Sequence, residues 1–510
     1  MELTRRASKG AVLNQLSMVA ETCLLFLFSV VAARGLGGAE YGVYSFIVSM
    51  SSLVILISTL GLNEAVNVFM PKMRGEKHRA SFLFKRLLVT RLISSAAAGG
   101  LYLLFAGRLA SLFGTPALAY YFRLSVLYIV ISGVTSLFMA YFMGRIDLGV
   151  VAFTRVAGAA VSLCAVYILL RMGCGIRAII IVSILVGLCV LAVYVFRTLA
   201  FLRLPGERCR LDMVYRFGFT LFLTVLLDYA LGKQIDIILL KYFRIEDSLI
   251  GYYNIAFSMY RFLSSFILAG LGGIGLASIS EISQKYGIGS TANAWSVLTK
   301  FSIGVVLPVM IFAVFRAREI VTVFYSGQFL GVVLLLQVAI LLGLPVRLLG
   351  GGTNITVLYA LGRERTALYC RLSAGVSNLV LDCLLIPEQI GPMRCAGLGV
   401  MGAIVATLGT GSIIHVVEFF MARRLIRMKY PGWFAVKVVV ASLVAAAVAW
   451  KIEAESVPAL IVACSVFSIT YILLVALFKP LSPYDGEVIS RVSPALAEKL
   501  KRWNILIGHE

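Results

Sequence analysis

Three charged residues, Asp228, Lys233 and Asp236, interrupt the otherwise apolar stretch LLDYALGKQIDIILLKYF, from Leu226 to Phe243. If this stretch crosses a bilayer, each charge at the centre costs roughly 2.5 to 3.5 kcal/mol on the lenient insertion scale, so it normally faces a partner or a wet cavity. A buried carboxylate can take up a proton or a sodium ion, and a buried cation can pair with phosphate. The stretch therefore predicts ion or phosphate chemistry in apolar surroundings.

The spacing of these charges restricts their arrangement. On one continuous helix they fall within a sector of about 140°. Lys233 and Asp236 are three residues apart and can pair, which leaves Asp228 to find its partner on another helix. A purely structural interpretation stays open, in which a carboxylate here pairs with a neighbouring cation to fix helix packing.

Other apolar stretches carry polar residues of the same kind. Asn14, Ser17 and Glu21 are spaced three and four apart, so they fall within about 60° of one another on a helix. Arg261 and Arg347 carry guanidinium groups, which match phosphate in a low-dielectric site. The candidate cavity residues are thus Arg261, Arg347, Lys233, Asn14 and Asn354, and the candidate ion-coupling residues are Asp228, Glu21 and Asp236.

The composition explains which elements must position these residues. Hydrophobic residues make up 60% of the 510 residues and charged residues 14%, and the mean hydropathy is +0.97. No water-soluble domain of this length has such a composition. The apolar runs are about 20 residues long and lack two-residue alternation, so they predict membrane-spanning helices and not barrel strands.

These runs predict about fourteen spanning helices. Most of the 46 basic residues fall on one side of the resulting topology. By the positive-inside rule this side is the cytoplasm, so we expect a multi-pass protein of the cell membrane with both termini in the cytoplasm. The predicted spans are 11–34, 41–70, 83–106, 117–143, 150–170, 177–199, 215–240, 249–279, 296–315, 330–359, 367–387, 398–421, 434–450 and 457–478.

The formal net charge of +22 is dispersed over short loops, which favours membrane lipids over nucleic acid as the partner. The nine cysteines form no CxxC pair and have no histidine at metal-ligand spacing. We therefore expect no metal site and no cofactor, apart from a coupling proton or sodium ion.

The chain also repeats itself. EYGVYSFIVSM (40–50) resembles LIGYYNIAFSM (249–259), with Gly42 matching Gly251 and Tyr44 matching Tyr253 at one constant offset. Each repeat holds an even number of helices, so the two lobes keep one orientation around a pseudo-twofold axis along the membrane normal. The expected parts are an N-terminal lobe (1–200), a cytoplasmic linker (201–214), a second lobe (215–423), an added helix pair (424–480) and a cytoplasmic tail (481–510).

Four segments carry a family resemblance: RGLGGAEYGVYSF, DIILLKYF with IGYYNIAFSM, YALGRERTALY, and NLVLDCLLIPEQIG with GVMGAIVAT. The chain resembles the polysaccharide exporters of the multidrug/oligosaccharidyl-lipid/polysaccharide (MOP) superfamily, the Wzx-type flippases of lipid-linked oligosaccharides. The resemblance implies a fold like that of MATE and MurJ transporters and a basic cavity, in which Arg261 matches an arginine of the eighth helix. The first helix has no arginine at the corresponding depth.

The resemblance also implies a function. The chain is expected to export a polyprenyl-pyrophosphate-linked oligosaccharide by ion-coupled alternating access, with a polysaccharide polymerase or assembly protein as candidate partners. One alternative is a multidrug or cation antiporter of the same superfamily, whose cavity would be acidic and aromatic. A glycosyltransferase, ligase or polymerase is a second alternative, but it needs a catalytic group on a large outer loop; the predicted outer loops are short, so no enzyme activity is expected.

Overall fold

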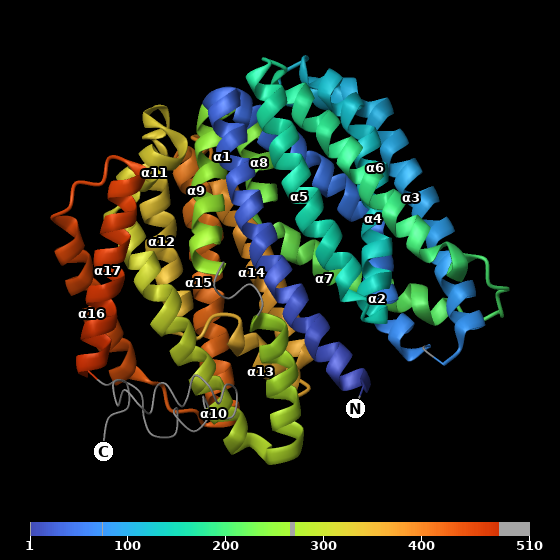
Figure 1. Ribbon diagram of the computed structural model, residues 1–510. Helices are drawn as coiled ribbons and strands as arrows, with labels where there is room; N and C mark the ends of the chain where they lie inside the picture. The colour runs from blue at the N-terminus through green and yellow to red at the C-terminus, as the bar shows by residue number, and fades with distance from the viewer. Residues whose placement is uncertain (1, 74, 266–270, 479–510) are drawn as a thin grey trace. The chain divides into compact units, whose positions relative to one another are not determined.

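The computed structural model describes residues 2–73, 75–265 and 271–478, with side chains described within 14–73, 75–264 and 289–478. This part of the chain is almost entirely helical (Figure 1). Twelve of its helical segments are long and apolar enough to cross a membrane. The predicted class, an all-α polytopic membrane protein, is confirmed, while the predicted tail lies outside the described residues.

The chain divides into two compact units. The first comprises Met1–Ile255 with Gly375–Thr407, and the second comprises Ala256–Ala374 with Leu408–Glu510. Three helices pass from one unit to the other, so these units are not the lobes expected from the repeat, and the lobe boundaries stay a prediction. The shared helices are α9 (Asp247–Ser265), α14 (Glu364–Leu385) and α15 (Gly399–Ile426).

The remaining elements belong to one unit each. The first unit contains α1 (Glu2–Thr59), α2 (Leu62–Lys72), α3 (Lys77–Leu112), α4 (Leu118–Arg145), α5 (Leu148–Arg171), α6 (Gly175–Leu202), α7 (Asp212–Ala230), α8 (Lys233–Tyr242), β1 (Gln389–Ile390) and β2 (Met393–Arg394). The second contains α10 (Leu271–Phe315), α11 (Ala317–Tyr325), the 3-10 turn η1 (Gly327–Phe329), α12 (Val332–Leu348), α13 (Thr353–Ala360), α16 (Gly432–Trp450) and α17 (Val457–Phe478).

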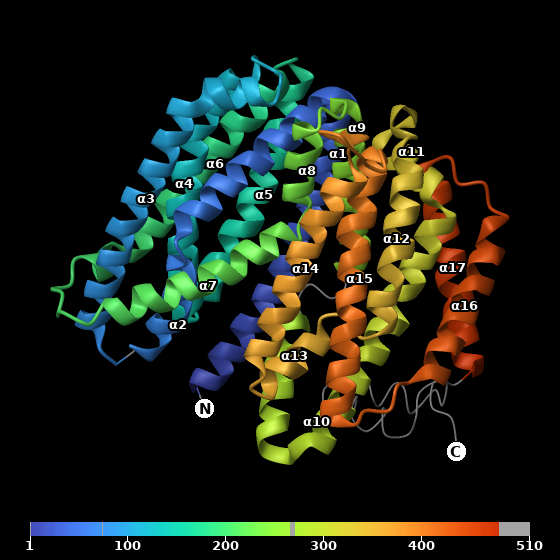
Figure 2. The same cartoon turned by 180° about the vertical axis from the view of Figure 1, so that it is seen from behind.

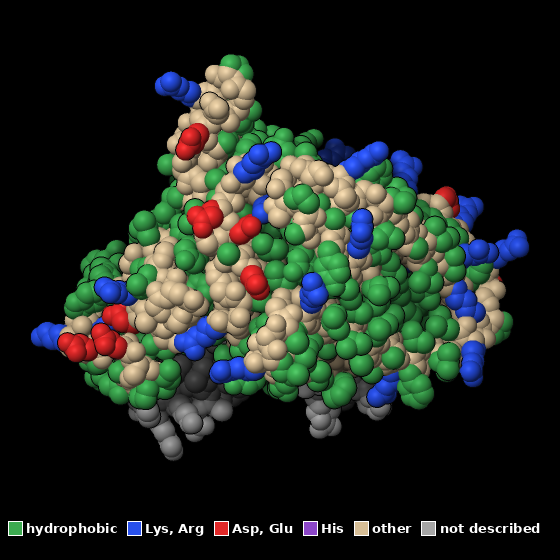
Figure 3. Space-filling view, turned by 90° about the horizontal axis from the view of Figure 1, so that it is seen from above, with side chains coloured by type: hydrophobic (Ala, Val, Ile, Leu, Met, Phe, Trp, Pro, Cys, Tyr) green, Lys and Arg blue, Asp and Glu red, His purple; other side chains and the backbone are tan. Residues whose placement is uncertain are grey.

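The strands β1 and β2 explain the long connector after Pro387. They pair antiparallel, with Gln389 opposite Arg394, and close into a hairpin through Gly391 at φ 57. The hairpin links α14 to α15, which run side by side in both views (Figures 1 and 2). On the face shown in Figure 3, basic and acidic side chains are interspersed among hydrophobic ones, as expected for charge spread over short loops.

The N-terminal helix α1 covers two predicted spans. It continues through Gly37, whose backbone is not helical (φ 78, ψ 171), so the chain bends there and the two spans differ in direction. The second of these spans is itself interrupted, because Leu60 and Gly61 have positive φ values of 48 and 73. The predicted span 41–70 is therefore two helical pieces, the end of α1 and α2.

A buried arginine stabilises this interruption. The Arg91 side chain on α3 is fully buried and donates to Ser58 Oγ at 3.2 Å and to the Gly133 carbonyl at 2.8 Å. A cation at the last turn of a helix complements the negative end of the helix dipole. Arg91 thus compensates the end of α1 at a depth where water is excluded.

Repeat-equivalent residues meet within the first unit. Asn254 donates to Ser45 Oγ at 2.6 Å, and these residues are 209 apart, the offset that relates Gly251 to Gly42. A Cβ on Gly42 would overlap the Asp247 carbonyl, and a Cβ on Gly251 would approach the carbonyl of Gly38. The two contacts are images of each other, as a twofold axis between the repeats requires.

This contact predicts an unusual response to alanine. Gly→Ala in a helix normally stabilises by about 1 kcal/mol, and Gly107→Ala on α3, where a Cβ meets open space, should follow that rule. Gly42→Ala should instead lower the melting temperature in detergent, because the added carbon collides with backbone on α9. Equal behaviour of the two variants would contradict the close contact.

Candidate functional site

The stretch that carries Asp228, Lys233 and Asp236 is not one helix. α7 ends at Ala230 and α8 begins at Lys233, with Gly232 extended between them (φ −107, ψ 154). Asp228 is exposed, whereas Asp236 is fully buried in the first turn of α8. The expectation that all three charges share one helix face is wrong, because the chain changes direction between Asp228 and Lys233.

Asp236 lies in a buried cluster built from four helices. Its Oδ2 accepts hydrogen bonds from the Tyr253 hydroxyl of α9 and, at 2.6 Å, from Thr407 Oγ1 of α15. Asp382 and Asn378 on α14 complete the cluster, and the two carboxyl groups are close enough to interact directly. Asp236, Asp382 and Asn378 are each 0% exposed, so this polar group is sealed inside the first unit.

The interruption before α8 contributes to the same cluster. Asn378 Nδ2 donates to the Ala230 carbonyl at 3.0 Å and to Asp382 Oδ2 at 3.1 Å. Ala230 is the last residue of α7, so its carbonyl has no intrahelical partner. The amide of Asn378 thereby connects the broken helix to the carboxylate pair.

Three oxygens of this cluster have no donor within the described part of the chain: Asp236 Oδ1, Asp382 Oδ1 and Asn378 Oδ1. No lysine or arginine from the described residues reaches either carboxylate. Two adjacent carboxylates cannot both be ionised in a buried site without a compensating positive charge. The cluster therefore has the composition of a site for a small cation or a proton.

Lys233 is not the partner of Asp236, and the expected pair between them is wrong within the described structure. Lys233 Nζ donates to Asn254 Oδ1 at 2.7 Å, and Asn254 in turn donates to Ser45. The break before α8 directs the lysine toward α9 and the repeat contact. The carboxylate of Asp236 therefore accepts hydrogen bonds from the hydroxyl groups of Tyr253 and Thr407 and not from Lys233.

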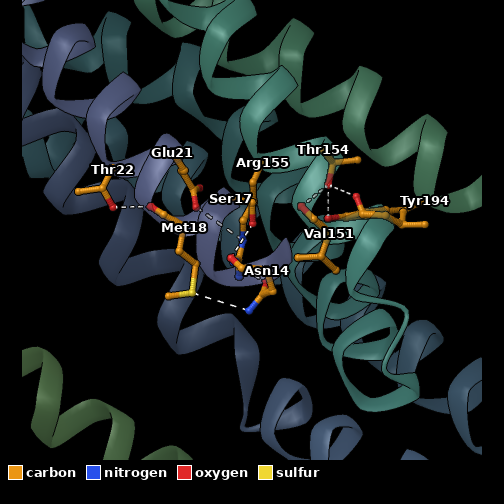
Figure 4. Close-up of polar contacts among 10 residues, drawn as sticks. Asn14, Ser17, Met18, Glu21, Thr22, Val151, Thr154, Arg155 and Tyr194 are labelled. Carbon is orange, nitrogen blue, oxygen red and sulfur yellow. Dashed lines mark hydrogen bonds and ion pairs between the residues drawn. The ribbon is translucent and has the colours of Figure 1, made fainter. Parts of the chain in front are cut away.

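A second polar group lies between α1 and α5 (Figure 4). Arg155 Nε lies 3.7 Å from Glu21 Oε2, and Arg155 Nη1 donates to Asn14 Oδ1 at 3.3 Å. Ser17 donates to the Asn14 carbonyl at 2.7 Å. The predicted track on the first helix therefore exists, and its cation comes from α5.

The candidate cations of the second unit differ in burial. Arg261 on α9 is exposed. Arg347, in the last turn of α12, is half-buried and lies near the Tyr260 phenol, and its Nε has no partner among the described residues. Gly343 lets this tyrosine approach, because a Cβ there would overlap the ring. Arg347 thus keeps donor capacity for an anionic ligand.

Asn354 has a defined structural role. It is fully buried, accepts from Trp295 Nε1 at 2.9 Å and donates to the Leu349 carbonyl at 2.8 Å. These bonds close the interruption between α12 and α13, where Gly350 and Gly351 have φ values of 88 and 48. In this conformation its polar groups are occupied by the protein.

Three important residues were missed by sequence reasoning. Arg155 is not one of the predicted site residues, although apolar residues flank it in VAFTRVAGAAV. Asn378 and Asp382 are also not among the predicted site residues. Their spacing of four in SNLVLDCLL puts both on one helix face, and this signal could have identified them.

A family model described as a polysaccharide biosynthesis protein matches residues 31–334, more than half of the chain. The chain belongs to this family. The match covers α2 to α11 and the whole of the α7–α8 interruption. No curated protein matches the chain.

Several solved transporters have a fold similar to that of this chain. The lipid II flippase MurJ in an inward closed conformation is similar with a TM-score of 0.70 and 16% identity, over 92% of this chain and 98% of MurJ. An inward-facing multidrug resistance MATE transporter of the MOP superfamily gives 0.68 and 13%, over 82% and 98%. A MOP superfamily transporter from Pyrococcus furiosus gives 0.60 and 14%, over 82% and 96%.

The predicted fold, like that of MATE and MurJ transporters, is therefore confirmed. Family and fold together support a multi-pass membrane protein of the polysaccharide biosynthesis family that shares its fold with solved transporters. The identities are all low, so the substrate and the coupling ion do not follow from these likenesses.

The ion pair between α1 and α5 predicts a nonadditive effect on stability. Arg155→Gln should destabilise the protein by about 1 to 2 kcal/mol, because it leaves the partly buried Glu21 without its cation. Adding Glu21→Gln should restore most of that loss. Melting temperatures of both single variants and the double variant measure the coupling.

Arg123→Gln on α4 is a matched control, since Arg123 is exposed and its loss should change the melting temperature little. Additive effects of the Glu21 and Arg155 substitutions would show that the two residues are not energetically coupled.

Proposed function

We propose that the protein is a flippase that moves a polyprenyl-pyrophosphate-linked oligosaccharide across the cell membrane, from the cytoplasmic to the outer leaflet, and that a cation bound at the Asp236–Asp382 cluster drives the movement. Membership of the polysaccharide biosynthesis family supports a glycan as the transported group. The likeness to a lipid II flippase supports a lipid-linked form of it.

The buried carboxylate pair carries the proposal. A packing role would be served by a carboxylate paired with arginine or lysine, as Glu21 is with Arg155. Asp236 and Asp382 instead have only neutral partners among the described residues. Burying such a pair is costly unless a cation or proton joins it, so the binding energy of that ion is available to bias the conformation.

The ligand atoms suit a sodium ion or a proton. The cluster offers carboxylate oxygens of Asp236 and Asp382, the amide oxygen of Asn378 and the hydroxyl of Thr407, and it adjoins the freed carbonyl end of α7. Discontinuous membrane helices commonly coordinate Na⁺ or H⁺ in this way. Among the described residues no three acidic, His or Cys side chains converge as a metal site, which favours a monovalent ion over zinc or another transition metal.

Binding at this cluster would act on four helices. Without the ion, the two carboxylates repel each other across the contact between α8 and α14. With the ion, α8, α9, α14 and α15 are drawn onto one centre. Since α8 follows α7 after a break in the helix, the ion would control the angle between the two helical pieces, a hinge of the kind that alternating access uses.

Arg261 and Arg347 are the proposed contacts for the pyrophosphate. Guanidinium groups bind phosphate oxygens in pairs, and the unpartnered Nε of Arg347 retains a donor for that purpose. A cationic drug would be repelled by these arginines, which disfavours the multidrug antiporter. Asp228 and Glu21, the other residues predicted for ion coupling, lie outside this cluster and are not part of the proposed ion site.

Added sodium ion should stabilise the purified protein. At a concentration one hundred times the dissociation constant, a ligand of the folded state contributes about 2.7 kcal/mol, which should raise the melting temperature in NaCl above that in choline chloride. Asp236→Asn and Asp382→Asn should each abolish the difference. If the bound ion is a proton and not sodium, the melting temperature of the wild type should depend on pH at constant salt, and the two variants should lose that dependence.

Asp228→Asn is the matched control, because Asp228 is exposed on α7 and outside the cluster. It should keep the full sodium effect. If Asp236→Asn kept that effect while Asp228→Asn lost it, the cation site would have been assigned to the wrong carboxylate.

Arg261→Ala and Arg347→Ala should abolish flipping of a lipid-linked oligosaccharide in proteoliposomes, while both variants still insert into the membrane. Arg365→Ala is the control, since this exposed arginine lies at the start of α14. Flipping is measured by access of an external lectin to the glycan. Wild-type flux in both cavity variants would overturn the basic-cavity proposal, and transport of ethidium-type cations would favour the antiporter.

A further inference from the structure

A histidine and a glutamate form an isolated pair in the second unit. His415 Nδ1 lies 2.9 Å from Glu418 Oε2, three residues further along α15. The Glu418 side chain is 1% exposed and its Oε1 has no donor among the described residues, whereas His415 is 21% exposed. The pair therefore has one sealed member and one member that reaches the molecular surface.

The pair lies deep in a spanning helix. α15 has 28 residues, about 42 Å of helix for a hydrocarbon core of about 30 Å. Arg423 and Arg424 stand in its last turn, about 12 Å along the axis from His415. His415 therefore lies in the interior of this helix and not at its end.

The neighbouring helices supply no competing partner for this pair. α15 packs on α14 through Cys370 and Met421, on α12 through Ser412, and on α10 through Phe419 and Trp295, and its Met421 and Leu425 pack on α13. Among the described side chains, the charged or titratable groups on those elements are Glu364, Arg365, Tyr369, Cys370, Arg371, Asp382 and Cys383 on α14, Arg347 on α12, Lys300 on α10 and Tyr359 on α13. In the described structure none of them bonds to His415 or Glu418.

The charge state of the pair follows from this isolation. With one shared proton the pair is neutral overall, either as imidazolium with carboxylate or as imidazole with carboxylic acid. Loss of that proton would leave a bare carboxylate in an apolar site, and gain of a second would leave a bare imidazolium; both are costly. A change in the number of protons on the pair therefore disfavours the closed site.

We propose that His415 and Glu418 form a proton-binding site, separate from the Asp236–Asp382 cluster, which exchanges its proton through the exposed edge of His415 when the surrounding helices open. The proposal extends the proposed ion coupling, because the transporter would then carry a proton at this second position. Histidine is suited to this role, since it changes charge between about pH 5 and pH 8.

The first test does not depend on transport. The chain has only three histidines, so histidine-selective ¹⁵N labelling of the full-length protein gives few imidazole signals, and His415→Gln assigns the one of interest. Its titration should shift or disappear in Glu418→Gln, because the proton is shared. An identical titration curve in wild type and Glu418→Gln would overturn the proposal.

The second test measures flipping in proteoliposomes at saturating sodium across the same pH range. Wild type should change in rate with pH, and the double variant His415→Gln with Glu418→Gln, which is neutral and still able to form a hydrogen bond, should lose that dependence. Retention of the wild-type pH profile in the double variant would overturn the proposal. Absence of flipping by wild type contradicts the proposed function alone, and the titration then decides the proton site.

Discussion

Two carboxylates buried beside each other without a cation are the constraint around which the first unit is built. Asp236 and Asp382 are 0% exposed, and buried polar groups need hydrogen-bond partners. Tyr253, Thr407 and Asn378 supply the neutral donors. The interruption between α7 and α8 is part of the same solution, since it brings a free helix end to Asn378. The geometry of four helices thus depends on one electrostatic requirement.

Interrupted helices recur where backbone groups find a side-chain partner. Ser94 donates to the Ser58 carbonyl at the end of α1, Asn378 donates to the Ala230 carbonyl at the end of α7, and Asn354 donates to the Leu349 carbonyl after α12. Irregular backbone at membrane depth is stable only where protein or enclosed water satisfies it. Each interruption therefore has a polar residue beside it, and each is a place where a helix can change direction at low cost. In the proposed transport cycle, these interruptions are where ion binding changes the direction of a helix.

The two units differ in how their buried charged residues are partnered. In the first, the acidic pair lacks a basic partner within the described residues, whereas Glu21 has Arg155. In the second, Arg347 keeps an unpartnered donor and the acid Glu418 is met by a histidine. This distribution is consistent with one set of groups for cations and another for an anionic substrate. A structural salt bridge, a phosphate contact and an ion site are distinguished by their partners and not by residue type.

The sequence by itself determined the membrane class, the positions of most spans, the repeat and the family, because hydrophobic run length and small-residue motifs are local properties. It also identified Asp236, Glu21 and Arg347 as unusual. It did not determine their partners, since hydrogen bonds such as Asn378 to Ala230, 148 residues apart, depend on which helices pack together. The break before α8 contains no proline, and its single glycine, Gly232, has an extended backbone that other residues can also adopt. The local sequence therefore did not predict the break. Only tertiary packing decided that Asp236 would be joined to α14 and Lys233 to α9, because both outcomes follow from the direction in which α8 leaves the joint.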